Sequence, residues 1–169
     1  MRVCSPPEDR TTRRAVLRGA AAALALAAVP GSALAAETAE EARHRGRVNY
    51  NGHRVSDATL RRTLQQIADR FGWTINITSG DRDYVPPGGS TTSLHLKHRA
   101  ADFHVAGVTD GHVFASLRGL RGGLLRRDYE VIWHGPHTQT TGPHVHLGRY
   151  GDGRPSKFMV ENGHGYQVV

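Results

Sequence analysis

The sequence of 169 residues contains one cysteine, Cys4, and no apolar run of the roughly 20 residues that a membrane-spanning helix needs. A single cysteine excludes a disulfide framework and a cysteine-rich zinc module. The short apolar runs predict that the protein is not an integral membrane protein. Hydrophobic residues make up 38% and charged residues 22% of the chain, which argues against disorder, and the length predicts one folded domain.

The first 35 residues have the pattern of an export signal. A twin arginine, Arg13-Arg14, precedes a short apolar segment at 19–29, and the segment is followed by a small-residue end at Ala33-Leu34-Ala35. A charged start, an apolar middle and an Ala-x-Ala end predict a cleavable signal over residues 1–35. The twin arginine favours the bacterial twin-arginine route. An ordinary secretory signal and a retained anchor are the alternatives.

Net charge falls when this segment is set aside. The chain carries 22 basic and 15 acidic residues, a net charge of +7; the first 35 residues hold five of the basic and two of the acidic ones, which leaves 17 and 13, or +4, in the remaining 134. This mild excess suits an anionic bacterial wall and does not indicate a nucleic-acid partner. We expect a flexible start over 36–50 and a folded domain over 51–169.

Hydrophobic periodicity predicts an α+β domain. Leucine, isoleucine and phenylalanine recur at helical spacing after Ser56, the expected N-cap, and Gly72 is the expected end of that helix. A second, shorter helix is expected, with Asp110 as its cap and the glycine pair Gly122-Gly123 at its end. Strands are expected at 73–77, 100–105, 129–134, 144–149 and 158–160. These elements predict a small, mostly antiparallel sheet with helices packed on one side.

Histidine is the unevenly distributed residue: eight of the eleven lie between positions 95 and 146. Residues i and i+2 of a strand share a face, so His144 and His146 point the same way, and Asp102 also leaves the core face of its strand. Asp102 and His146 converge if their strands are neighbours, and a turn can bring His95 beside them. Two imidazoles and one carboxylate, with a fourth position left to water, describe a catalytic zinc site. The other histidines are expected on the surface or in loops, although His134 and His137 flank the loop before the strand at 144–149.

Three motifs together resemble the zinc D-alanyl-D-alanine carboxypeptidases, a family of peptidoglycan peptidases that shares its fold with the hedgehog signalling domain. They are Ser-Gly-x-Arg ending at Arg82, a Ser-x-His…Ala-x-Asp pattern from Ser93 to Asp102, and the His-x-His at 144–146. The resemblance covers about residues 60–150. It implies one zinc ion per chain held by three ligands, which are His95, Asp102 and His146. It also implies that Arg82 faces the scissile carbonyl or a substrate carboxylate, and that Ser93 helps to hold the substrate.

Two departures from the family pattern concern the backbone and the general base. His98 stands where the family has glycine, which is costly if the backbone there has a positive φ. The family places a carboxylate three or six positions before the last ligand, but residues 132–145 contain none. The candidates for the base are therefore His144 and Glu130, because each is expected to leave the buried face of its strand.

The resulting hypothesis is an exported zinc D,D-peptidase, either a carboxypeptidase or an endopeptidase, that acts on peptidoglycan stem peptides. A non-catalytic, zinc-bearing wall-binding module on the same scaffold is the alternative, favoured by the missing carboxylate. A histidine-rich metal-binding protein of unrelated fold is a third possibility.

Overall fold

The computed structural model describes residues 45–87 and 89–169. The predicted export signal at 1–35 lies outside these residues, as does most of the start expected to be flexible at 36–50. Within the described ranges, no helix is long and apolar enough to cross a membrane.

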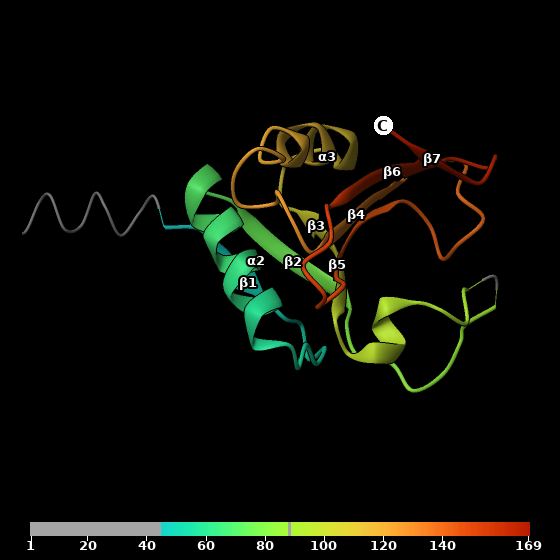
Figure 1. Ribbon diagram of the computed structural model, residues 1–169. Helices are drawn as coiled ribbons and strands as arrows, with labels where there is room; N and C mark the ends of the chain where they lie inside the picture. The colour runs from blue at the N-terminus through green and yellow to red at the C-terminus, as the bar shows by residue number, and fades with distance from the viewer. Residues whose placement is uncertain (1–44, 88) are drawn as a thin grey trace, which may run out of the picture.

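One mixed sheet of seven strands forms the body of this region, in the order β1-β2-β3-β5-β4-β6-β7 (Figure 1). The strands are β1 (Arg47–Asn49), β2 (Thr74–Ser79), β3 (Ala100–Val105), β4 (Tyr129–His134), β5 (His144–Arg149), β6 (Lys157–Glu161) and β7 (Tyr166–Val168). The helices are α2 (Ala58–Phe71), α3 (Asp110–Arg118) and the 3-10 helix η1 (Leu94–Lys97). The α+β class predicted from the sequence is confirmed.

The sheet is antiparallel at four of its six strand pairs. The parallel pairs are β1 with β2 and β4 with β6. The sequence predicted neither β1 nor β7. Strand β1 is only three residues long and lies within 36–50, so this part of the expected flexible start is ordered, contrary to expectation. Both strands are too short for an alternating pattern to be visible in the sequence.

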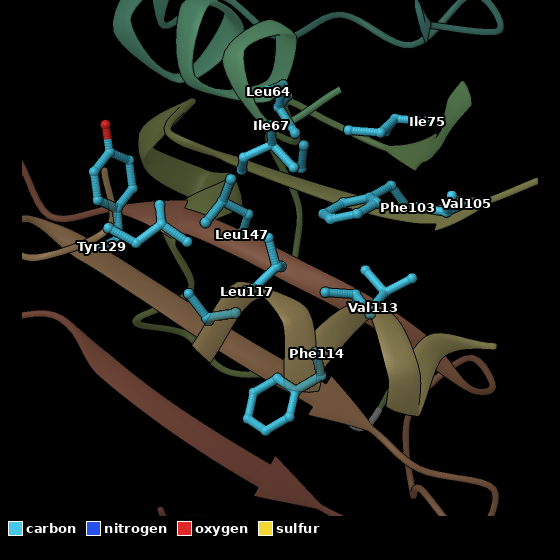
Figure 2. Close-up of a cluster of buried hydrophobic side chains, with 14 of the residues drawn as sticks. Leu64, Ile67, Ile75, Phe103, Val105, Val113, Phe114, Leu117, Tyr129 and Leu147 are labelled. Atoms are coloured by element: carbon cyan, nitrogen blue, oxygen red, sulfur yellow. The ribbon is translucent and has the colours of Figure 1, made fainter. Parts of the chain in front are cut away.

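Both α-helices pack on one face of the sheet. Leu64 and Ile67 of α2 and Leu117 of α3 belong to the same buried cluster as Phe103 of β3 and Leu147 of β5 (Figure 2). Because strand residues alternate between faces, the even-numbered residues of the central strands β3, β5 and β4 point to the opposite face. That face carries the strand residues of the predicted metal site.

Helix α2 begins one residue later than expected. Its N-cap is Asp57, whose side chain accepts a hydrogen bond from the backbone N–H of Leu60 at 2.8 Å. Ser56, the predicted cap, instead donates its backbone N–H to the Asp81 carboxylate. The carboxylate of Asp57 also forms an ion pair with Arg149 of β5 at 2.8 Å. Gly72 ends the helix with φ of 65°, as predicted.

Helix α3 also differs slightly from expectation. Thr109 is its N-cap, and Asp110 is the first helical residue. The Asp110 carboxylate lies 2.9 Å from Nδ1 of His104. The helix ends at Arg118, earlier than the glycine pair at 122–123 suggested.

Candidate metal centre

Asp102 and His146 meet because β3 and β5 are neighbours in the sheet. The two residues are direct partners in the antiparallel register, and Asp102 Oδ1 lies 2.8 Å from His146 Nδ1. The inward-facing residues beside them, such as Phe103 and Leu147, are fully buried in the core. The strand adjacency on which the sequence argument depended is confirmed.

His95 reaches the same point from a single 3-10 turn. Ser93 caps η1 by accepting a hydrogen bond from the backbone N–H of His95. The turn ends at His98, whose φ of 56° is the left-handed conformation that favours glycine. His98 therefore occupies a glycine-like position, as the family pattern suggested, and its ring contacts Asp83 at 2.9 Å.

Gly80 orients the His95 ring from the other side. Nδ1 of His95 donates to the carbonyl oxygen of Gly80 at 2.6 Å, which leaves the Nε2 lone pair free to bind a metal. A Cβ at position 80 would lie 2.0 Å from the carbonyl oxygen of Arg54. Glycine is therefore required here for this segment to pass close to the backbone of Arg54.

Three potential ligand atoms converge: His95 Nε2, Asp102 Oδ1 and His146 Nδ1. His95 Nε2 lies 2.9 Å from Asp102 Oδ1 and 3.2 Å from His146 Nδ1. Ligands about 2.0–2.1 Å from a tetrahedral zinc ion are about 3.3 Å apart, so a modest expansion of this triangle fits an ion. No other group of three or more such donors comes together in the described part of the chain.

Electrostatics in this cluster favour a bound cation. Burial alone would raise the pKa of Asp102, but its contacts with His146 and His95 outweigh this effect and hold that pKa well below its usual range. Burial would lower the pKa of His146, but the carboxylates of Asp102 and Glu130 raise it to about 9. The buried carboxylate therefore favours positive charge beside it, which a divalent cation could supply.

A cavity of about 610 Å³ opens over the cluster, and all seven site residues predicted from the sequence line it. One wall is the segment between β2 and β3, and another includes residues of the segment between β4 and β5. Both segments extend on the same side of the molecule, away from α2 (Figure 1). The cavity would give a substrate access to an ion held by these three residues.

His144 lies beside the cluster with one nitrogen facing it. Its Nδ1 donates to the carbonyl oxygen of Gly142 at 2.7 Å, and its Nε2 lies 3.6 Å from Asp102 Oδ1. Burial lowers its pKa, and Asp102 only partly offsets this. His144 is therefore neutral at neutral pH, with a free Nε2 lone pair directed at the site.

His134 and Glu161 are neighbours of the site that were not assigned to it from the sequence. The rings of His134 and His144 are stacked with centroids 4.3 Å apart. His134 Nδ1 lies 3.0 Å from Glu161 Oε2, and Glu161 also accepts hydrogen bonds from Thr138 Oγ1 and the backbone N–H of Gly163. The only sign of this contact in the sequence was that His134 would lie opposite His144 if the strands on either side of the 135–143 loop paired as a hairpin.

Glu130 lies on the far side of the His146 ring. Its Oε1 is 3.5 Å from His146 Nε2, whereas Nδ1 is the nitrogen that faces Asp102. Tyr150 donates a hydrogen bond to its Oε2 at 3.1 Å. Glu130 therefore touches a predicted ligand but does not face the position that the ion would occupy.

Arg82 and Ser93 both lie on the wall formed by the β2–β3 segment. Arg82 Nε is buried without a hydrogen-bond partner in the described residues, and other parts of Arg82 line the cavity. Ser93 Oγ is already engaged as the cap of η1. His137, the other histidine near the last ligand, is exposed.

A known protein family matches the larger part of the chain. The model of the peptidase M15 family matches residues 19–129, well over half of the chain. The chain belongs to the peptidase M15 family. No curated protein and no solved structure matches the chain. Family membership confirms the resemblance and argues against a metal-binding protein of unrelated fold. The matched range includes His95 and Asp102 but ends before His146, which is placed beside them by the geometry of β5.

Proposed function

We propose that this member of the M15 family is an exported zinc peptidase that cleaves D-amino-acid-containing bonds in peptidoglycan stem peptides, as a carboxypeptidase or an endopeptidase. The observation that carries the proposal is the convergence of His95 Nε2, Asp102 Oδ1 and His146 Nδ1 within 4.8 Å of one another at a cavity large enough for a peptide. Two imidazoles and one carboxylate leave a coordination position open, as a catalytic site requires and a structural zinc site does not.

His144 is the residue best placed to act as the general base. When bound, zinc polarises the scissile carbonyl and lowers the pKa of water at the site. His144 Nε2 takes the proton of the attacking water and then passes it to the leaving amine. Its other nitrogen is fixed by Gly142, so the lone pair stays directed at the site. Glu130 is less well placed because the His146 ring lies between its carboxylate and the point where the three ligand atoms converge.

Positive charge around the cavity suits a substrate that carries carboxylates. Arg82 lines the cavity, and its planar guanidinium fits a terminal carboxylate or a developing oxyanion. Lys97 and Lys157 also line the cavity. Stem peptides of the bacterial wall are anionic, and the predicted twin-arginine signal would deliver the protein to the compartment that contains them.

A wall-binding module without catalysis is the second candidate. This candidate is favoured by where the carboxylates near the cluster, other than Asp102, lie in the described residues. Glu130 lies behind His146 and Glu161 lies against His134, so neither faces the open position. If His144 cannot replace the missing carboxylate, the same cavity would bind wall peptides without cleaving them.

A chelator-controlled digest distinguishes the two candidates. Purified protein is incubated with peptides ending in D-Ala-D-Ala and with cross-linked muropeptides, and the products are separated by mass spectrometry. Release of D-alanine identifies a carboxypeptidase, and loss of cross-links identifies an endopeptidase. Cleavage must stop with a chelator and return with added zinc. Zinc and wall binding without any product would overturn the enzymatic proposal and support the module.

A further inference from the structure

The His146 ring has two nitrogens in different surroundings. Nδ1 faces Asp102 and His95 at 2.8 and 3.2 Å. Nε2 is buried on the opposite side of the ring and makes no hydrogen bond within the described residues. When Nδ1 supplies its lone pair to a metal, the neutral ring carries its proton on Nε2. A buried N–H left without an acceptor is destabilising.

Glu130 is the acceptor that faces this nitrogen. Its Oε1 lies 3.5 Å from His146 Nε2. The two residues are not direct partners: Glu130 lies opposite Gly148, while His146 lies opposite Ile132. A Cβ at position 148 would stand 2.9 Å from His146 Nε2. Glycine at this position therefore leaves the space through which the Glu130 carboxylate approaches the ring.

Neighbouring groups fix the position of the Glu130 carboxylate. Tyr150 donates its hydroxyl to Oε2 at 3.1 Å, and Lys157 is the cross-strand partner of Glu130 on β6. Glu130 thus directs Oε1 at the ring while Tyr150 fixes its second oxygen.

We propose that Glu130 is a positioning residue for the metal centre: it accepts the Nε2–H of His146 and holds the ring with Nδ1 free for the ion. Tyr150 in turn orients Glu130. Histidines that bind metals commonly donate their second N–H to a carboxylate, which fixes the tautomer and the ring plane. This inference rests on the proposed function, and it replaces the general-base role that the sequence left open for Glu130.

Zinc affinity tests the inference without relying on turnover. The dissociation constant is measured by competition with a chromophoric chelator for the wild type and for Glu130→Ala, Glu130→Gln and Tyr150→Phe. We expect the zinc dissociation constant of Glu130→Ala to rise roughly 10- to 100-fold. Glu130→Gln should recover part of the loss, because its amide oxygen still accepts a hydrogen bond. Tyr150→Phe should weaken binding by only a few fold.

Asp110→Asn is the matched control. Asp110 also pairs with a histidine, His104, at 2.9 Å, but that histidine is not part of the cluster. The zinc affinity of Asp110→Asn should equal that of the wild type. The visible spectrum of the cobalt-substituted protein should change in Glu130→Ala and not in Asp110→Asn, because only the former alters the orientation of a ligand.

The possible outcomes separate this inference from the proposed function. Wild-type zinc affinity in Glu130→Ala would overturn the positioning role while leaving the peptidase intact. A normal zinc affinity in Glu130→Gln, combined with turnover at saturating zinc that is slower by roughly two orders of magnitude or more, would make Glu130 the general base instead. A wild-type protein that binds no zinc would overturn the proposed function itself, and this inference with it.

Discussion

Asp102 and His146 face each other across the centre of the sheet with 2.8 Å between Oδ1 and Nδ1, although 44 positions separate them in the chain. Their contact is a direct product of strand register, since β3 and β5 pair these two residues. His95 joins them from a turn fixed by Gly80. The centre is therefore built on the most buried part of the sheet, which keeps its geometry well defined.

Removing a ligand and removing the base should have separable effects. We expect His146→Ala to lose zinc, and His144→Ala to retain zinc while its turnover slows by roughly 10²–10⁴-fold, the usual contribution of a general base. Zinc is measured by mass spectrometry of the dialysed protein, and turnover by peptide hydrolysis. Full zinc content in His146→Ala would show that the ligand assignment is wrong. Unchanged turnover in His144→Ala would show that another residue accepts the proton.

Arg82→Lys should impair catalysis without affecting the metal. Lysine keeps the positive charge but lacks the planar guanidinium that can form two parallel hydrogen bonds. A hydrogen bond to a charged group contributes about 1.5–3 kcal/mol, so kcat/KM should fall roughly 10- to 100-fold. Zinc content should not change, because the hydrogen bond that Arg82 donates to the His95 carbonyl comes from its backbone N–H, which the substitution keeps. Wild-type kcat/KM in this variant would place the substrate elsewhere in the cavity.

Glu161 should make the stability of the protein sensitive to acid. Burial would raise its pKa, but hydrogen bonds from Thr138, Gly163 and His134 lower it to about 2, from 4.5. A lowered folded-state pKa stabilises the protein above pH 4.5, and this stabilisation is lost as the pH falls toward 2. We expect Glu161→Gln to destabilise the protein by about 1–3 kcal/mol at pH 7. In denaturant titrations, the difference from wild type should shrink below about pH 3; a difference that stays constant with pH would contradict this explanation.

Asp57 should contribute to stability both as a helix cap and as an ion-pair partner. Asp57→Ala removes the hydrogen bond to the Leu60 N–H and the contact with Arg149, which should cost about 1–2 kcal/mol in free energy of unfolding. Asp57→Asn keeps a side-chain oxygen for the cap and removes the charge. The two variants, compared by denaturant unfolding, separate the contributions. Equal losses would show that the ion pair with Arg149 is dominant.

The main elements and the three converging residues could be predicted from the sequence because each rests on a local pattern. Alternation in β4 and β5 fixed both their bounds and the shared face of His144 and His146. The neighbouring positions of β3 and β5 could only be assumed, since strand order is not a local property. The same limit explains why β1, β7 and the contact between His134 and Glu161 were missed: each depends on which strands meet.

The N-cap of α2 shows a second reason why a prediction from the sequence can fail. Serine and aspartate are both good caps, and the sequence presents them side by side. The choice of Asp57 depends on tertiary partners, because Asp81 engages Ser56 and Arg149 engages Asp57. Capping preference alone could not distinguish two adjacent candidates.

Alternation along β5 also restricts where the chain can gain or lose residues. Val145 and Leu147 fill the core, and His144 and His146 alternate with them on the opposite face. A deletion of one residue within this strand would exchange the two sets, so imidazoles would enter the hydrocarbon interior and aliphatic side chains would replace the donors. Length changes compatible with both folding and metal binding are therefore confined to the connecting segments.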